Sequence, residues 1–362
     1  MFNNKRIIKI ETLSNKINEW ANWKISNFEL LMFFNIVSNR SFYDITQYPV
    51  FHWTIKNYKD SKIPSETDLR DFNLPVGMLE IDEERSKKRK KKFIDEYIES
   101  GFEVGKNRHY GSHYSNPLYV SHYLTRLFPI VHIHIEFQGD KFDDPNRLFF
   151  SIKNSFYCAT TQQGDVREIV PQFYYMPEMF LNINNLNMGK RIDENKNYLA
   201  VDNVEVPKWS NDVFDFICKM KEILENDEVS YKINEWIDLI FGYKQTGKEA
   251  EICGNVFEYN TYEDNINLDA QDKANRSYLM RKVEFGLTPS QVLSKQMFYR
   301  FSKEALKRGK QITESKDLKA YGNPYSSKGG KIKEKPLMLK MKVLETDKVV
   351  CVYSNNTSNL TR

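Results

Sequence analysis

The chain has 362 residues and a nearly balanced charge, with 53 Lys and Arg against 49 Asp and Glu, so its net charge of +4 selects no class of partner. Hydrophobic residues make up 40% of it, enough for a substantial core. Its four cysteines lie far apart, which argues against a disulfide framework and fits a reducing compartment. No stretch approaches the roughly 18 apolar residues of a membrane span, and the first ten residues lack the apolar core of a secretory signal.

The first third of the chain combines one clear helix pattern with irregular sequence. Residues 1–22 form a polar lead-in. Ser26, with Glu29 three positions later, has the pattern of a capping box and predicts a helix over 26–38. Three prolines interrupt residues 44–79, which we expect to be irregular or extended in short pieces.

Further helix patterns follow, with one predicted strand. Helices are expected at 83–100, 116–127, 146–157, 211–226, 230–242 and 245–257. Residues 130–137 alternate apolar side chains with His and Glu, which predicts a strand. Residues 303–335 are rich in lysine and glycine, as in a mobile linker. Residues 337–353 regain apolar alternation, as at the start of a β-domain.

The run at 236–245 is dense in apolar and aromatic groups and contains one carboxylate, Asp238. An ionised carboxylate is costly to bury without partners, so we expect Asp238 to have them. The overlapping segment 242–248 has most of the spacing of a phosphate-binding loop. Position 249 is Glu instead of the hydroxyl that holds magnesium, and the preceding spacing suits a buried helix at least as well as a strand. The sequence therefore argues against a nucleotide site here.

A series of other segments accompanies this run. In chain order the series is ISNFELLM at 25–32, QYPVF at 47–51 followed by Trp53, YGSHYS at 110–115, QG at 138–139 with FD at 142–143, DPNRLF at 144–149, PQFYYMPE at 171–178, WIDLIFGYKQ at 236–245, and FG at 285–286 with TPSQ at 288–291. Together they resemble the signature of the BEACH domain family, in the family's order. The resemblance covers about residues 20–295.

This resemblance implies a mainly α fold, with many helices around a core of extended, irregular segments and a few short strands. We expect a lead-in at 1–22, a BEACH domain at 23–295 and a Lys-rich flexible tail at 296–362, which is compatible with the start of a truncated WD40 region. BEACH proteins usually carry a pleckstrin-homology-like domain before the BEACH domain and WD40 repeats after it. The flanking segments are too short for either module, which predicts a piece of a larger protein or a minimal member.

The implied function is that of a non-enzymatic scaffold or adaptor in vesicle trafficking, acting through protein–protein contacts. Family members act in membrane fusion and fission, in the size of lysosome-related organelles and in autophagy. The resemblance implies no cofactor and a cytoplasmic location, peripheral to endolysosomal or other vesicle membranes. Other proteins are the expected partners, including a pleckstrin-homology-like domain in cis or in trans.

The resemblance also implies a partner-binding groove near the start of the domain. Candidate groove residues are Asn27, Asn35, Arg40, Tyr43, Asp44, Gln47, Tyr48 and Trp53. The alternative for the polar members is an interior role, because segments without regular structure need side chains to satisfy their backbone groups. Candidate structural residues of the motifs are Tyr110, Gly111, His113, Tyr114, Trp236, Asp238, Gly242 and Gln245. We interpret Asp238 and Glu178 as buried anchors.

A cluster of histidines supplies a second hypothesis, a metal-dependent hydrolase. All six fall between His52 and His134. His109 and His113 are four residues apart, and His132 and His134 would share one face of a strand. Neighbouring tyrosines and the absence of an H-E-x-x-H pattern favour a polar-aromatic packing layer instead.

A basic run supplies a third hypothesis. Its members are Arg85, Lys87, Lys88, Arg89, Lys90, Lys91 and Lys92. It has three interpretations: a solvated helix face, a surface for acidic lipid at about 1 kcal/mol per basic residue, and a basic nucleic-acid-binding protein. Stacking aromatics are missing from the run, so nucleic acid is not the expected partner.

Overall fold

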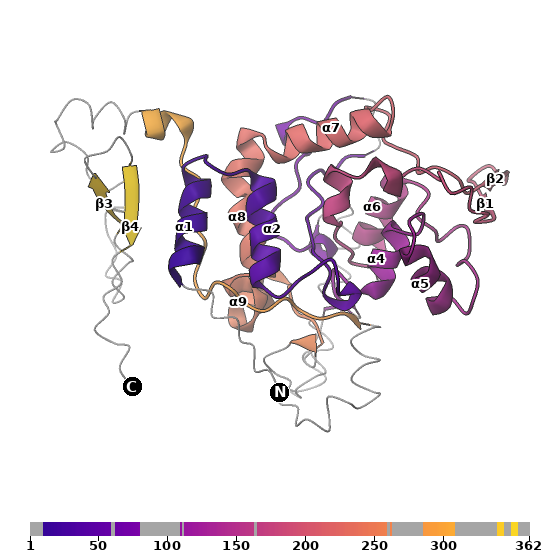
Figure 1. Cartoon of the computed structure of the whole chain (residues 1–362), viewed down its shortest axis with the longest axis horizontal. Helices are drawn as coiled ribbons and strands as arrows, with labels where there is room; N and C mark the ends of the chain where they lie inside the picture. The colour runs from indigo at the N-terminus through magenta and orange to yellow at the C-terminus, as the bar shows by residue number, and fades with distance from the viewer. Residues whose placement is uncertain are drawn as a thin grey trace, which may run out of the picture. The chain divides into compact units, whose positions relative to one another are not determined.

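The computed structural model describes residues 10–58, 62–79, 109–110, 112–162, 165–258, 261–262, 285–307, 339–343 and 349–353. The described chain is mainly α-helical with a few short strands, as predicted (Figure 1). It divides into two compact units, one of residues 25–299 and the other of residues 1–24 with 300–362.

The unit of residues 25–299 contains most of the described elements. Its α-helices are α2 (Asn27–Val37), α4 (Pro117–Tyr123), α5 (Ile130–Phe137), α6 (Ile152–Thr161), α7 (Val213–Leu224), α8 (Asp227–Ile240) and α9 (Gly247–Cys253). Its 3-10 helices are η1 (Ile45–Gln47), η2 (Glu66–Asp68), η3 (Val76–Met78), η4 (Pro171–Tyr174), η5 (Pro177–Met179) and η6 (Tyr243–Gln245). One antiparallel hairpin pairs β1 (Lys190–Ile192) with β2 (Tyr198–Ala200) and lies at the far end of this unit from α8 (Figure 1).

Helix α8 is the centre of the helical part of this unit. It begins at the N-cap Asn226, whose side chain accepts a hydrogen bond from the backbone of Val229 at 2.7 Å, and its first turn is acidic. Every residue from 236 to 240 is buried, so this end of the helix is enclosed on all sides. Helices α2 and α7 pack against it, and Phe34 of α2 stacks on Phe241 with ring centroids 5.7 Å apart.

An extended segment, not a helix, forms the other part of the core. Every residue from 50 to 55 is buried, although the segment forms only isolated bridges, from Phe51 to Ile169 and from Ile55 to Leu69. Trp53 lies within 6.4 Å of four aromatic rings, including those of Phe156 and Phe173. The irregular, extended core implied by the family resemblance is therefore present.

Several predicted boundaries agree with the structure. The capping box of α2 is confirmed, since Ser26 and Glu29 exchange backbone and side-chain hydrogen bonds. Helices α4, α7, α8 and α9 fall on or beside the predicted ranges. The predicted helix at 146–157 begins later, after the N-cap Ser151. The predicted helix at 83–100 lies outside the described residues.

The predicted strand at 130–137 is wrong, because this segment is helix α5. Its buried side chains, Val131 and His134, are three residues apart, which is the spacing of one helical face. The apparent alternation of apolar residues with His and Glu concealed this spacing. His132 and His134 therefore do not share a strand face.

The unit of residues 1–24 and 300–362 joins segments from the two ends of the chain. Helix α1 (Ile10–Ala21) is followed by Trp23, whose indole donates a hydrogen bond to the carbonyl of Phe301 at 2.8 Å. The guanidinium of Arg300 lies 3.8 Å from the centre of the Trp23 ring and donates to the carbonyl of Trp20. The same unit contains the antiparallel hairpin of β3 (Leu339–Val343) and β4 (Val349–Tyr353), the segment predicted to regain apolar alternation.

Candidate functional site

A buried ion pair holds the extended core segment. The guanidinium of Arg70 donates to both carboxylate oxygens of Glu168, at 2.7 and 3.0 Å, and both side chains are almost fully buried. The same carboxylate accepts from the backbone N–H of Trp53 at 2.9 Å and from the indole of Trp236 at 3.0 Å. One carboxylate thus connects the extended segment to α8. Sequence reasoning missed Glu168, which follows Asp165 and Arg167 in a charged stretch and so does not stand out as Asp238 does.

The side chain of Asn35 forms the hydrogen bonds to the same segment that a neighbouring strand would form. Its side-chain oxygen accepts from the backbone N–H of Val50 at 2.8 Å, and its amide donates to the carbonyl of Val50 at 3.0 Å. A second amide bond reaches the carbonyl of Leu31 at 2.9 Å. Backbone groups that a sheet would satisfy are therefore paired with one side chain of helix α2.

Other predicted residues satisfy carbonyl groups in the same way. Arg40 donates to the carbonyls of Tyr48 and Leu287, at 2.7 and 2.5 Å. Gln245 donates to the carbonyls of Ile240 and Pro289, at 2.6 and 2.8 Å. The interior role that we weighed for the polar residues is therefore confirmed for Asn35 and Arg40.

Most of the candidate groove residues lie in the interior. Five of the eight are buried, namely Asn27, Asn35, Arg40, Tyr48 and Trp53. A partner could not contact these side chains unless the domain rearranged. For these five residues, the predicted direct contact with a partner is therefore replaced by a role in the interior of the domain. Tyr43 is fully exposed, while Asp44, which caps η1 through Thr46, and Gln47 are half-buried. Partner contact stays a prediction for these three.

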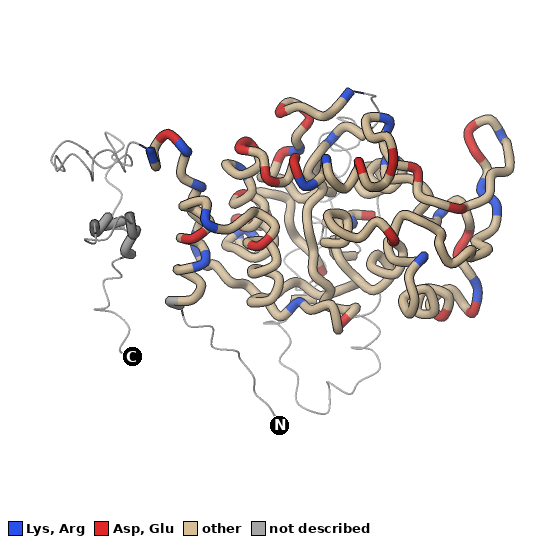
Figure 2. The backbone as a smooth tube through the Cα atoms, turned by 45° about the horizontal axis from the view of Figure 1, so that its top comes forward, with Lys and Arg blue, Asp and Glu red and all other residues tan. Residues whose placement is uncertain are grey.

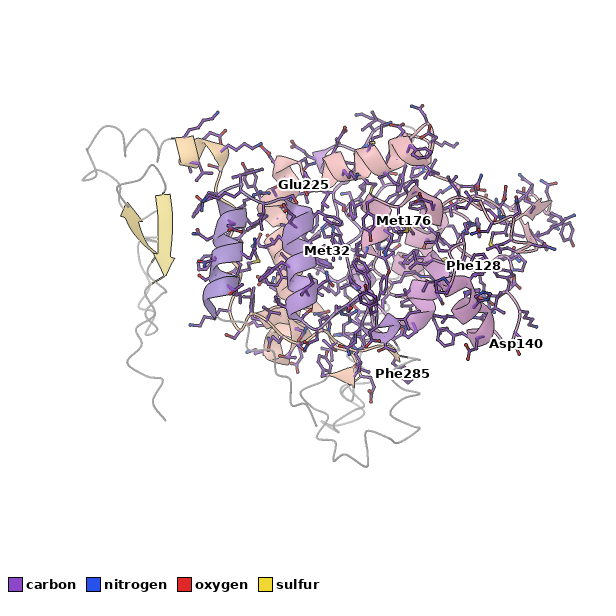
Figure 3. The ribbon with its side chains drawn as sticks, in the orientation of Figure 1. Met32, Phe128, Asp140, Met176, Glu225 and Phe285 are labelled. Carbon is purple, nitrogen blue, oxygen red and sulfur yellow. The ribbon has the colours of Figure 1, made fainter. Side chains whose placement is uncertain are left out.

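An apolar groove of about 530 Å³ lies beside α2, next to these residues. Its lining consists of Phe28, Met32, Phe42, Tyr174, Tyr175, Lys221, Leu224 and Glu225. Phe42 and Tyr175 are 43% and 40% exposed. Figure 3 shows Met32 on α2 and labels Glu225 near the end of α7. We call these eight residues the aromatic groove.

Glu225 sets the position of α2 against α7 and was not predicted. Its two carboxylate oxygens accept from the backbone N–H groups of Asn27 and Phe28, at 2.8 and 2.9 Å. Asn27 then donates to the carbonyl of Leu224 and to the hydroxyl of Ser230. A carboxylate at a helix N-terminus is favourable because the orphan N–H groups and the helix dipole both attract it. These contacts fix one wall of the aromatic groove.

The tryptophan motif of 236–245 is an interior anchor. Asp238 is fully buried and accepts from the backbone N–H of Met297 at 2.9 Å, while its second oxygen has no hydrogen-bond partner in the described structure. Burial raises the pKa of Asp238 to about 7. Position 242 has room only for glycine, because a Cβ there would lie 2.7 Å from the Cα of Asp238. Among the described residues, the partners expected for Asp238 are thus present on one of its two oxygens.

Three of the remaining structural candidates, Tyr110, His113 and Tyr114, pack in one aromatic cluster around Phe257. The phenol of Tyr110 donates to the carbonyl of Gly254 at 2.8 Å, and the ring of His113 stacks on Phe257 at 4.1 Å. Tyr114 and Trp236 are buried. Glu178 is exposed, so its interpretation as a buried anchor is wrong.

The histidines are dispersed among packing contacts. His52 lies between the rings of Phe72 and Trp236, and burial lowers its pKa to about 3. Burial also lowers the pKa of His109 to about 3. Among the described residues, no group of three or more His, Cys, Asp or Glu side chains is placed to hold a metal ion. The described geometry gives the hydrolase hypothesis no site.

Several predicted features cannot be placed. The basic run at 85–92, Gly111 and most of the predicted linker at 303–335 lie outside the described residues. None of the described helices is long and apolar enough to span a membrane. Figure 2 shows acidic and basic residues interspersed along the described backbone.

Comparison with known proteins defines the class. The sequence profile of the Beige/BEACH domain matches residues 18–300. The chain is 38% identical over 280 residues to a neurobeachin homolog of Caenorhabditis briggsae and 37% identical over 280 residues to one of Caenorhabditis elegans, in each case over 76% of this chain. It is 36% identical over 295 residues, or 80% of its length, to BEACH domain-containing protein B of Arabidopsis thaliana.

The chain therefore belongs to the Beige/BEACH family. The similarity spans only 11% of the length of each of these three relatives.

Proposed function

We propose that this chain is a non-enzymatic scaffold of vesicle trafficking, in which the aromatic groove receives another protein. The observation that supports this most strongly is the groove itself. Exposed aromatic side chains that gather in one hollow are typical of binding surfaces, because their area is unfavourable in water and aromatic residues dominate interface energies.

The construction of the groove also suits docking. Its wall is held by the contacts of Glu225 and Asn27, so little ordering would accompany binding, and preorganisation of this kind favours affinity. Lys221 is exposed at the rim and offers a charge to a partner's carboxylate. The family resemblance suggests a pleckstrin-homology-like domain, in cis or in trans, as the occupant.

The location that we propose is cytoplasmic, peripheral to endolysosomal or other vesicle membranes. The basic run at 85–92 would add a weak attraction to acidic lipid, at about 1 kcal/mol per basic residue. The proposed roles in membrane fusion or fission, in organelle size and in autophagy follow from the family resemblance.

The test is the size and number of acidic vesicles in cells that lack this gene, with rescue by three forms of the chain and with an empty vector for comparison. The forms are the natural chain, the groove variant Phe42→Ser/Tyr175→Ser and the control Phe214→Ser. Phe214 is 60% exposed on α7 and does not line the groove, so its substitution removes an exposed aromatic ring elsewhere on the same unit.

Rescue by the natural chain and by the control, with failure of the groove variant at equal protein level, is the expected result. Equal rescue by the groove variant would remove the docking role of the groove. Normal vesicles in the deleted cells would overturn the trafficking function itself.

A further inference from the structure

A second hollow lies among helices α4, α5 and α6 and is unlike the aromatic groove. It measures about 260 Å³, and polar residues from several elements line it. Among them are His122 of α4, His134 of α5, Arg147 of the loop before α6, and Arg167. Gln138, Asn146, Asn154 and Gln162 add side-chain amides. No part of the docking role uses this hollow, which we call the polar pocket.

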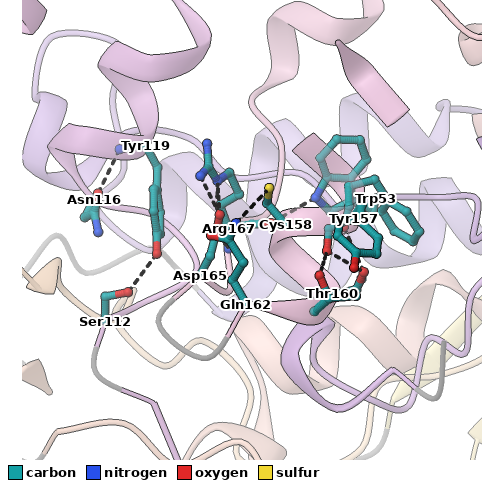
Figure 4. A network of polar contacts seen from close by, with 12 residues as sticks. Trp53, Ser112, Asn116, Tyr119, Tyr157, Cys158, Thr160, Gln162, Asp165 and Arg167 are labelled. Carbon is teal, nitrogen blue, oxygen red and sulfur yellow. Dashed lines mark hydrogen bonds and ion pairs between the residues drawn. The ribbon is translucent and has the colours of Figure 1, made fainter. Parts of the chain in front are cut away.

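The ion pair of Arg167 uses only one side of its guanidinium group. Asp165 accepts from its Nε at 2.8 Å and also from Nη2, and the guanidinium lies 5.1 Å from the centre of the Tyr119 ring (Figure 4). Nη1 is buried and has no hydrogen-bond partner in the described structure. Because a guanidinium can only donate, this end of Arg167 requires an acceptor.

Two histidine nitrogens are in the same situation. His134 is 4% exposed, and its Nε2 has no partner among the described residues, as is also the case for Nε2 of His122. Burial and then the nearby Arg167 lower the pKa of His122, while burial lowers and Asp143 raises the pKa of His134. Among the described residues, three nitrogens from three parts of the chain thus lack hydrogen-bond partners, and all three belong to residues that border one hollow. A buried polar group without a partner is unfavourable by about 1–3 kcal/mol.

The charges around the pocket decide what kind of ligand fits. Asp165 pairs with Arg167 and Asp143 pairs with Arg147, so the ionised groups balance. Each arginine keeps N–H groups that its carboxylate does not bind: Arg147 is 70% exposed, and Nη1 of Arg167 has no hydrogen-bond partner among the described residues. These groups match a small ligand rich in acceptor oxygens and negative in charge.

We propose that the polar pocket binds a phosphate-class oxyanion, held by the free end of Arg167, by Arg147 and by His122 and His134. Planar guanidinium groups suit phosphate oxygens, and charge-assisted hydrogen bonds are the stronger kind. A volume of about 260 Å³ is several times the share of one water, about 30 Å³, so a phosphate group fits with room for a short ester substituent. Inorganic phosphate and a phosphomonoester headgroup share this chemistry.

The experiment uses the full chain and two probes, inorganic phosphate and glycerol phosphate, in chloride buffer. Binding is followed through the imidazole NMR signals of His122 and His134 and by titration calorimetry, at pH 8 and at pH 6. The variants are Arg147→Gln, the paired change Asp165→Asn/Arg167→Gln, which keeps the charge balanced, and the control Lys248→Gln on the exposed face of α9.

Saturable binding that shifts both imidazole signals is expected. The paired variant should bind at least about tenfold more weakly, because one charge-assisted hydrogen bond is removed. Arg147→Gln should weaken binding less, and Lys248→Gln should leave it unchanged. Binding should be no tighter at pH 6 than at pH 8, because burial lowers the pKa of both His122 and His134, whereas the phosphate probes take up a proton in this range and lose negative charge.

Tighter binding of glycerol phosphate than of phosphate would identify a headgroup as the ligand, and the reverse would identify the free ion. Equal weakening by Lys248→Gln would mean nonspecific attraction and would overturn the proposal. Imidazole signals that stay unmoved at about 10 mM of both probes, ten times a 1 mM dissociation constant, would do so as well.

Discussion

The core around Glu168 and the surface around Phe42 reverse the usual distribution of residue types. In the core, Arg70 and Glu168 form an ion pair that is almost fully buried. At the surface, Phe42 and Tyr175 are 43% and 40% exposed in an apolar hollow. Charged groups are normally outside and large aromatic groups inside, so each region needs a reason of its own.

The two reasons are different in kind. The core contains an extended segment at 50–55 that has only isolated bridges, so side chains must satisfy its backbone. Glu168 and Asn35 supply those bonds. The aromatic groove satisfies no such need, and its exposure is unfavourable for the isolated chain. The buried polar residues around the extended segment therefore serve the fold, and we propose that the exposed aromatic residues of the groove serve binding.

The largest effect is expected from Glu168→Gln. The substitution leaves the buried guanidinium of Arg70 without its countercharge, and breaking a buried pair in this way lowers the free energy of unfolding by about 3–5 kcal/mol. Urea unfolding followed by tryptophan fluorescence measures it. Glu205→Gln is the control, because that carboxylate is 58% exposed in its pair with Arg191 and should cost no more than about 1 kcal/mol. Similar losses in the two variants would refute the special role of the interior pair.

A smaller loss is expected from Asn35→Ala. Two backbone groups of Val50 lose their partner inside the core, which lowers the free energy of unfolding by about 1–3 kcal/mol. Amide hydrogen exchange at Val50 gives a local readout and should accelerate more than exchange in α8. Asn195→Ala, in the exposed turn of the β1–β2 hairpin, is the comparison variant and should be neutral. An unchanged exchange rate at Val50 would contradict the assignment.

Asp238→Asn should change how stability depends on pH. The folded pKa of about 7 lies above the ordinary 3.8, so the folded chain holds this proton more tightly than the unfolded chain. The stabilisation is complete below pH 3.8 and is lost as pH rises through about 7. The natural chain should therefore lose about 2 kcal/mol relative to the variant between pH 5 and pH 8. Parallel urea curves with a constant difference across this range would show that Asp238 does not titrate as described.

The smallest effect on stability is expected from the groove variant Phe42→Ser/Tyr175→Ser. Its side chains are partly in water already, so its free energy of unfolding should fall by no more than about 1 kcal/mol. Thermal unfolding beside Phe214→Ser measures the difference. A loss as large as that of Glu168→Gln would place these aromatics in the fold and not in binding.

The sequence predicted the helices better than it predicted the residues that line the aromatic groove. The capping box at Ser26 and the buried helix at Trp236 follow from local spacing, which is why these elements were found. The segment 130–137 was assigned wrongly because a short apolar run can satisfy two periods at once. Motif membership indicated that Asn35 and Arg40 matter, but it could not separate burial from binding.

The residues that sequence reasoning missed act over long separations. Glu168 meets Arg70 across 98 positions and Trp53 across 115, and Glu225 meets Asn27 across 198. No local periodicity of the sequence indicates such pairs. The groove lining likewise comes from segments near residues 28, 42, 174 and 224, which only the fold brings together.

The most direct test of the docking role is site-specific photo-crosslinking in cells. A photoreactive phenylalanine analogue replaces Phe42 in one chain and Phe214 in another, each expressed at the natural level. The account predicts a discrete crosslinked protein of defined mass from position 42 that is absent from position 214. Crosslinks of equal yield and pattern at the two positions, or none at position 42, would contradict it.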